Sequence, residues 1–286
     1  MRNEEISEIR IEHALEESGN IHPKLLLEVK NLSIAYEGMP VVRNISFCLC
    51  EGEILGIAGE SGSGKSTLIR AIMGILGREG EIFSGEIWYR GKSLTDMSER
   101  ERQLLRGKEM GMVFQDSKAS LCPVRKIGPQ VLDMMRAHGK ISKREAYAKA
   151  SEIMEKTGLT DPGRILNSYP FELSGGMNQR VGICMAMLLN PGLLLADEPT
   201  SALDVTVQKQ VVEELLLMRQ EYRTSMILVT HNIGVLRKMA DQILVMKDGC
   251  VVESGAADRV LEQPENGYTR ELIDAQLHVK TEYHGE

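Results

Sequence analysis

The sequence predicts an α/β fold, and three features of the chain lead to this prediction. Short β-type runs follow one another between residues 25 and 94. After Ser174, apolar runs alternate with helical segments, a pattern typical of a mainly parallel sheet. A glycine-rich loop at residues 59–66 separates an apolar run from a helical one. We therefore expect a parallel α/β core accompanied by a smaller, strand-rich part.

Composition narrows the classes of protein that fit the chain. The 286 residues include 42% hydrophobic and 26% charged residues, an ordinary globular profile that excludes collagen and wholesale disorder. The formal net charge of −7 provides no electrostatic footprint for nucleic acid, and we expect no nucleic-acid partner. The five cysteines indicate neither a disulfide framework nor a zinc site, and a reducing compartment is expected. They are Cys48, Cys50, Cys122, Cys184 and Cys250.

Both ends of the chain are expected to lie outside the folded domain. Residues 1–24 form an acidic lead-in that lacks the apolar region of a signal peptide, and we expect it to be disordered. No apolar run approaches the roughly 20 residues that span a bilayer, so any membrane role would be peripheral. The expected organisation is a domain at 25–275, with a helical insert at about 119–180, and a tail at 276–286.

The elements follow from local patterns along the chain. β-type runs at 25–36, 41–50 and 52–58 are bounded by Gly, Pro or Asn, and a further strand at 84–94 is expected to join the same small sheet. The sequence predicts a helix at residues 68–76. Within the insert, Ser142 is expected as an N-cap with Glu145 three residues on, and Gly158 is a stop signal.

The second half of the chain alternates strand and helix. An apolar run at 193–197 precedes a helical segment at 205–219, and a further apolar run leads to His231. Asp248-Gly249 between two β-type runs is the strongest short-range hairpin signal.

The glycine-rich loop fits the pattern G-x-x-x-x-G-K-[ST] in the required strand-to-helix context. Holding phosphate oxygens requires several backbone N–H groups aimed at one small volume, which glycines and a helix N-terminus provide. Lys65 is expected to reach the β and γ phosphates, and the Ser66 hydroxyl to bind Mg²⁺. The expected phosphate-binding residues are Gly59, Glu60, Ser61, Gly62, Ser63, Gly64, Lys65, Ser66 and Thr67.

Two acids end the apolar run at 193–197. Asp197 is placed to orient Mg²⁺ or its waters, and Glu198 to polarise a water for attack on the γ-phosphate as a general base. Between Lys65 and Asp197 lie too many residues for adjacent βα units, so further material must be folded into the sheet.

That intervening material carries the family resemblance. Leu173-Ser174-Gly175-Gly176 followed by Gln179-Arg180 resembles the signature motif of ATP-binding cassette (ABC) ATPases, which are P-loop NTPases with an antiparallel β-subdomain and an inserted α-helical subdomain. In the same order along 25–275, single residues match further motifs of that family. They are Tyr36 for the aromatic that stacks on adenine, Gln115 for the Q-loop, residues 201–204 for the D-loop and His231 for the switch histidine.

The resemblance implies roles for these residues. Gln115 would join Ser66 and Asp197 in holding Mg²⁺. His231 would contact the γ-phosphate, and Asp204 would couple two sites. Ser174, Gly175 and Gly176 would complete the ATP site of a facing subunit, so that two chains, identical or different, would sandwich two ATPs.

Flanking stretches resemble one class within the family. Residues 114–125, 197–208 and a Tyr-Thr-Arg triplet at Tyr268 are similar to the ATPases of dipeptide, oligopeptide and nickel importers, and the short C-terminal region resembles the nickel-type members. Ser117, Cys122 and Asn232 depart from the usual Pro, Asn and Asp. The cargo, peptide or nickel and metal chelate, stays open.

The function implied is ATP hydrolysis that powers uptake, at the cytoplasmic face of a membrane. The partners would be transmembrane permease subunits, a second ABC ATPase subunit and, indirectly, an extracytoplasmic substrate-binding protein. The segment from Gln115 through the insert would dock on the permease, and we expect Val124 and Ile127 on that docking surface. Exporter ATPases and soluble cassettes acting on ribosomes or DNA remain alternatives. A non-hydrolysing regulator is disfavoured because Glu198 and His231 are both present.

Overall fold

The computed structural model describes residues 24–282, and the side chains of residues 24–275. The expected acidic lead-in at 1–24 therefore lies almost wholly outside the described residues. The chain divides into two compact units: the first takes the described residues up to Glu99 and from Ile227 onwards, and the second takes Arg100–Met226. Among the described residues, no helix combines the length and the hydrophobicity that crossing a bilayer requires.

The first unit contains an antiparallel sheet built from the N-terminal strands, in the order β2-β1-β4-β5. Their bounds are β1 (Leu25–Tyr36), β2 (Met39–Cys50), β4 (Gly80–Tyr89) and β5 (Lys92–Ser93). The central strand β1 pairs along its length with both β2 and β4. The strand expected at 84–94 begins four residues earlier, at Gly80, and is split into β4 and β5, but it joins the small sheet as predicted.

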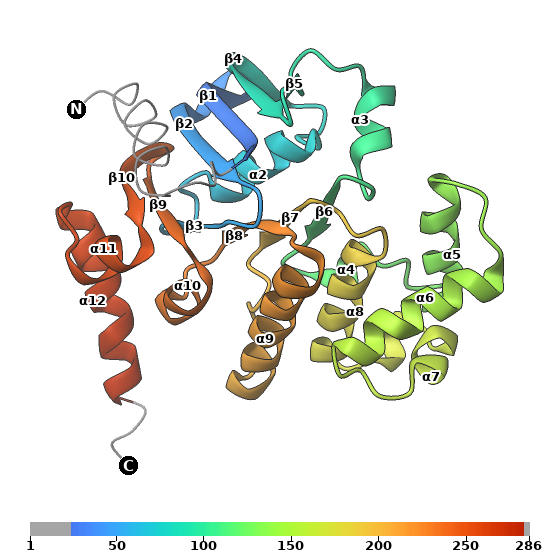
Figure 1. The fold of residues 1–286 in the computed structure, drawn as a ribbon. Helices are drawn as coiled ribbons and strands as arrows, with labels where there is room; N and C mark the ends of the chain where they lie inside the picture. The colour runs from blue at the N-terminus through green and yellow to red at the C-terminus, as the bar shows by residue number, and fades with distance from the viewer. Residues whose placement is uncertain (1–23, 283–286) are drawn as a thin grey trace. The chain divides into compact units, whose positions relative to one another are not determined.

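The other strands of this unit follow the order β10-β9-β3-β8, with helices beside them (Figure 1). Strand β3 runs parallel to β9, and β9 and β10 form the antiparallel hairpin predicted from Asp248-Gly249. Both turn residues have positive φ, 49° and 79°, as a tight hairpin turn requires. The elements are β3 (Ile54–Ala58), α2 (Lys65–Met73), β8 (Ser225–Val229), α10 (Ile233–Met239), β9 (Gln242–Lys247), β10 (Cys250–Ala256), α11 (Ala257–Glu262) and α12 (Gly267–Glu282).

One predicted helix end and the predicted start of the tail differ from the structure. Helix α2 stops at Met73 because Gly74 takes a left-handed conformation (φ 69°) and its N–H bonds the carbonyls of Ala71 and Arg70, so the following Ile75 and Leu76 are not helical. Helix α12 continues to Glu282 and so enters the stretch 276–286 that the sequence analysis assigned to a tail.

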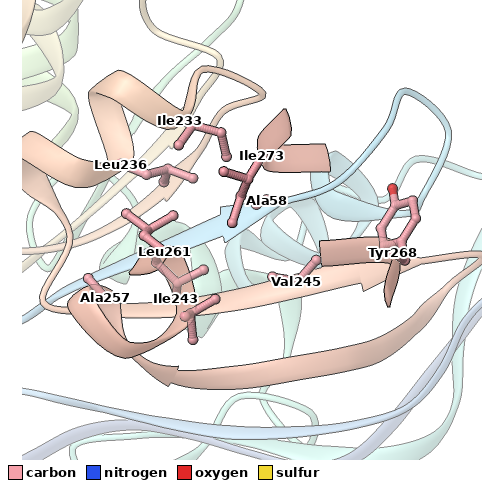
Figure 2. Packing of buried hydrophobic residues seen from close by; sticks show 10 residues of the cluster. Ala58, Ile233, Leu236, Ile243, Val245, Ala257, Leu261, Tyr268 and Ile273 are labelled. Carbon is pink, nitrogen blue, oxygen red and sulfur yellow. The ribbon is translucent and has the colours of Figure 1, made fainter. Parts of the chain in front are cut away.

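The core of the first unit lies where α10, α11 and α12 cover β3 and β9. Figure 2 shows apolar side chains from these elements gathered beside the strands. Ile243 and Leu236 are fully buried, and Val245 is 1% exposed. Strand β9 is buried on both faces, which explains why its sequence is continuously apolar instead of alternating.

The second unit contains a parallel strand pair and the predicted helical insert. Strand β6 pairs with β7 from Met110↔Leu193 to Val113↔Ala196. Helices α5, α6 and α7 pack on one another (Figure 1). The elements are α3 (Glu99–Leu105), β6 (Met110–Val113), α4 (Ser117–Ser120), α5 (Ile127–Ala137), α6 (Lys143–Lys156), α7 (Pro162–Asn167), the 3₁₀ turn η1 (Pro170–Glu172), α8 (Gly175–Met187), β7 (Leu193–Asp197) and α9 (Val205–Tyr222).

Helix α6 begins and ends where the sequence predicts. The Ser142 side chain accepts the Glu145 N–H at 3.2 Å, and the Glu145 carboxylate accepts the Ser142 N–H at 2.9 Å, a complete capping box. Gly158 follows the helix with φ 69°. Helix α7 was not predicted, although Asp161 at its N-cap and Pro162 at its first position are ordinary start signals.

Candidate functional site

The predicted phosphate loop, in the first unit, has the strand-loop-helix context that the sequence indicates. It follows β3 and leads into α2, and Gly59, Gly62 and Gly64 have φ values of 147°, 84° and 96°. A Cβ on Gly59 would lie 2.2 Å from the backbone oxygen of Met246 on β9. Position 59 therefore requires glycine for its dihedral angles and for the close approach of β9.

Lys65 is buried within the loop that it is expected to serve. Its Nζ donates to the backbone oxygens of Gly59 (2.8 Å) and Glu60 (2.6 Å) and lies 3.4 Å from Ser63 Oγ, and the residue is only 6% exposed. The loop thus surrounds the ammonium group, and these hydrogen bonds hold both the loop backbone and the lysine side chain in place. Ser66 and Thr67 follow in the half-exposed first turn of α2. A buried ammonium and a helix N-terminus together form an anion-binding surface.

Tyr36 and His231 belong to the same unit. Tyr36 ends β1 half-buried, and its ring packs over Gly80, where a Cβ would lie 2.9 Å from Tyr36 Cε1. His231 is exposed in the loop after β8. The next residue, Asn232, accepts the Val235 N–H at 3.3 Å and caps α10, so asparagine performs locally the capping that aspartate would perform.

The acidic pair lies in the second unit. Asp197 is the last residue of β7 and is 1% exposed. Glu198 is half-buried and has φ 47°, a left-handed conformation that is uncommon for a glutamate and that recurs at functional sites. Its carbonyl accepts the Ser201 N–H at 3.0 Å. A tight turn therefore ends β7 immediately after the buried aspartate.

Gln115 reaches this turn. Its Nε2 lies 3.4 Å from Ser201 Oγ, so the segment after β6 contacts the predicted D-loop. Gln115 itself is exposed. The structure thus brings Gln115 and the predicted D-loop together, a proximity that their separation in sequence does not reveal.

The signature motif forms the start of α8. Ser174 caps the helix by accepting the Met177 N–H at 3.2 Å, and Ser174 and Gly175 are exposed. A Cβ on Gly176 would lie 2.8 Å from Val207 Cγ1, so glycine permits α8 to approach α9 closely. Asp204 caps α9 by accepting the Val207 N–H at 3.0 Å. Both predicted motifs therefore sit at neighbouring helix starts.

A buried ion pair that the sequence did not predict fastens α8 to α9. Arg180, at the end of the signature motif, donates to the Glu214 carboxylate on α9 and to the Thr157 carbonyl after α6. Glu214 is 5% exposed, and this burial raises the pKa of its carboxyl to about 7 despite the opposing effect of Arg180. The motif at Gln179-Arg180 is a signal that could point to the arginine. No signal points to its partner Glu214, which lies 34 residues further along the chain.

The raised pKa of the Glu214 carboxyl should make the free energy of unfolding depend on pH. Because the folded pKa exceeds that of the unfolded chain, the contribution of Glu214 is greatest below the unfolded pKa and is lost as the pH rises through about 7. The free energy of unfolding of the wild type minus that of Glu214→Gln should therefore fall by an amount on the order of 3 kcal/mol between about pH 4 and pH 8. Urea titrations of both proteins across this range measure the difference. A difference that stays constant with pH would contradict the assignment.

Comparisons with known proteins are consistent with this arrangement. A family model described as ABC transporter matches residues 42–201. The oligopeptide transport ATP-binding protein OppD of Bacillus subtilis is 44% identical over 253 residues, 87% of this chain and 71% of the relative. The metal-staphylopine import system ATP-binding protein CntD of Staphylococcus aureus is 39% identical over 260 residues, 90% of this chain and 96% of the relative.

A solved structure agrees in fold. The ATP-binding cassette MJ0796, determined as a dimer bound to ADP and phosphate, superimposes with a TM-score of 0.73 at 30% identity, over 81% of this chain and 99% of that chain. The α/β fold with its antiparallel sheet and the resemblance noted from the signature motif are thereby confirmed. The chain belongs to the ABC transporter family.

Proposed function

We propose that this chain is the ATP-hydrolysing subunit of an importer for peptides or metal chelates. The observation that carries the proposal is the phosphate loop closed around Lys65, in a chain whose relatives are transport ATP-binding proteins. OppD and the dipeptide transport protein DppD of Lactococcus lactis are named for peptides, and CntD is named for a metal chelate. This chain is about equally similar to all three, at 39 to 44% identity, so both cargo classes stay in the proposal.

In this proposal each predicted residue acts on bound ATP. Lys65 and the N–H groups of its loop bind the β and γ phosphates, and Tyr36 stacks on the adenine. Glu198 accepts a proton from the attacking water as the general base. His231 contacts the γ-phosphate and reports its presence. The positive φ of Glu198 supports its role, because such backbone strain persists where function requires a particular side-chain direction.

The residues present suit Mg²⁺. Among the described residues no group of three or more His, Cys, Asp or Glu could hold a metal ion. Mg²⁺ in phosphate sites is usually held by one or two carboxylates together with waters and substrate phosphates, so the buried Asp197 can supply the carboxylate that this ion needs. Ser66, Gln115 and Asp197 supply oxygen ligands of the preferred type. Bound with ATP, the ion would neutralise charge that develops on the phosphates.

Two chains are proposed to share their ATP sites. Ser174 and Gly175 are exposed at the N-terminal end of α8, a helix long enough to carry a dipole, and they are free to meet a phosphate outside their own chain. Asp204 caps the adjacent helix and so fixes the D-loop beside them. MJ0796 was solved as a dimer bound to ADP and phosphate. We infer that this chain pairs with an identical or related subunit.

The proposed permease-docking surface lies on the second unit, with one correction. Val124 is 79% exposed, as expected, but Ile127 is fully buried at the start of α5 and cannot contribute. Apolar residues three positions apart look alike in sequence, and only packing separates the exposed one from the buried one. Phe171, which is 62% exposed, takes the place of Ile127 in the proposed docking surface. Its ring stacks on the ring of Tyr169, and the Lys126 Nζ lies 5.8 Å from the centroid of the Tyr169 ring.

The experiment is an affinity purification of the tagged chain from detergent-solubilised native membranes, with ATP hydrolysis assayed in the same fraction. Recovery of permease subunits, a second cassette subunit and an extracytoplasmic binding protein is expected. A Val124→Asp/Phe171→Asp double variant should lose most of the permease, because two carboxylates would be buried without partners. Leu104→Asp changes a residue of similar exposure (63%) on α3 and should retain it.

The docking surface is refuted if the double variant recovers as much permease as the wild type. Recovery of ribosomes or DNA in place of membrane subunits would refute the transport proposal and leave the ATP site in place.

A further inference from the structure

A tyrosine from the far end of the chain bonds the phosphate loop. The hydroxyl oxygen of Tyr268, on α12, accepts the backbone N–H of Glu60 at 3.0 Å, across 208 residues of sequence. Tyr268 is 8% exposed. Figure 2 shows its ring beside Val245, with the hydroxyl directed away from the strand. Burial raises the pKa of the Tyr268 phenol above its ordinary value, so the group is a neutral hydroxyl at physiological pH.

The bonded peptide group is the one that also holds Lys65. The N–H of Glu60 and the carbonyl of Gly59 belong to the same planar unit and point in opposite directions. The Gly59 oxygen accepts from Lys65 Nζ at 2.8 Å. Tyr268 and Lys65 therefore form hydrogen bonds with opposite sides of a single peptide group. Hydrogen bonds that share a peptide group polarise and strengthen one another.

The position of Tyr268 is itself fixed from several sides. The Asn266 side chain accepts the Tyr268 N–H at 2.9 Å and donates to the Val252 carbonyl of β10 at 3.3 Å. The Lys247 Nζ lies 4.5 Å from the centroid of the tyrosine ring, a cation–π contact. Tyr268 also belongs to the buried cluster that contains Ala58, the last residue of β3. The hydroxyl is thus presented to the loop by a rigid support.

The start of the loop has little other freedom. A Cβ on Gly59 would lie 2.2 Å from the Met246 backbone oxygen of β9, so the Gly59 backbone has no room to move toward this strand. The freedom that remains to the Gly59–Glu60 peptide group is rotation about the backbone bonds that flank it. A hydrogen bond to its N–H selects one orientation of that peptide. The same orientation aims the Gly59 carbonyl at the ammonium group of Lys65.

We propose that Tyr268 is a positioning residue for nucleotide binding, through which helix α12 holds the Gly59–Glu60 peptide in the orientation that places Lys65. The proposal rests on the proposed function, since it assumes that this loop binds the phosphates of ATP. It assigns to the C-terminal helix a part in the nucleotide site. Tyr268 touches the loop backbone and acts on the phosphates only through Lys65.

The test is Tyr268→Phe, which removes the hydroxyl and keeps the buried ring and its contact with Lys247. The Kd for ATP and the KM for ATP hydrolysis should rise about three- to tenfold, the effect of one lost hydrogen bond, with kcat changed less than about twofold. The Glu60 amide should lose protection from hydrogen exchange. The midpoint of thermal unfolding without nucleotide should shift by less than about 3 °C, because the ring stays buried.

The matched control is Tyr222→Phe. It removes a hydroxyl that lies 3.4 Å from Lys156 Nζ in the second unit, and nucleotide binding should not change. If Tyr268→Phe binds ATP as tightly as the wild type, or loses affinity only in proportion to a lowered unfolding midpoint, the positioning role is overturned. A wild-type chain that binds no ATP would overturn the proposed function itself, so the two failures are distinguishable.

Discussion

Glu198→Gln is expected to reduce ATP turnover by about 10²- to 10⁴-fold, the usual contribution of a general base. Glutamine has the size of glutamate but cannot accept the proton of the attacking water. The substitution leaves Lys65 and the hydrogen bonds that hold it in its loop in place, so ATP should still bind. Phosphate release under saturating ATP, with labelled nucleotide retained on the protein measured in parallel, separates the two effects.

The control for this variant is Glu152→Gln, which removes the charge of a 63% exposed glutamate on α6 that pairs with Lys156. It should hydrolyse ATP at the wild-type rate. Undiminished turnover in Glu198→Gln would remove the general-base assignment, and loss of ATP binding in this variant would show that the change acts through the fold.

Lys65→Met is expected to weaken ATP binding by at least about a hundredfold. A charged group 6% exposed interacts strongly with phosphate oxygens because little water screens it. The substitution also removes the donor that binds the Gly59 and Glu60 carbonyls, so the loop loses its internal support together with its charge. Equilibrium titration with a fluorescent ATP analogue measures the effect.

Lys30→Met serves as the matched control, because Lys30 is an exposed lysine on β1 of the same unit. The affinity of this variant for ATP should equal that of the wild type. Lys65→Arg should not restore binding, since a branched guanidinium does not fit the space that the loop leaves for an ammonium group. ATP binding by Lys65→Met at wild-type affinity would reject the phosphate-loop assignment.

Elements whose signals lie within a few residues could be predicted from the sequence. The Asp248-Gly249 hairpin needs two residues of positive φ, and the capping box at Ser142 and Glu145 needs only one helical turn. The strand-loop-helix context of the proposed phosphate loop was equally predictable, because its glycines, its lysine and the flanking strand and helix are contiguous. The end of helix α2 was predicted at Leu76 and lies at Met73, because Gly74 was not recognised as its stop signal.

Contacts between distant segments could not be predicted. Val124 and Ile127 are both apolar and three residues apart, yet one is 79% exposed and the other fully buried, because α5 packs the second against its neighbours. The partners of Arg180 and Tyr268 are likewise invisible in the sequence, since nothing local to either residue specifies which distant group it meets.

The sequence by itself determined which residues the proposed chemistry uses: the predicted phosphate loop around Lys65, the acid pair Asp197 and Glu198, and the predicted signature motif at Ser174. These depend on short-range backbone geometry and on residue type, which are properties of a few adjacent residues. Only the tertiary structure decided how that chemistry is supported. The Tyr268 hydroxyl meets the Glu60 N–H because the packing of α12 against β3 and β9 brings together residues 208 apart, and burial in a shared core has no local sequence signature.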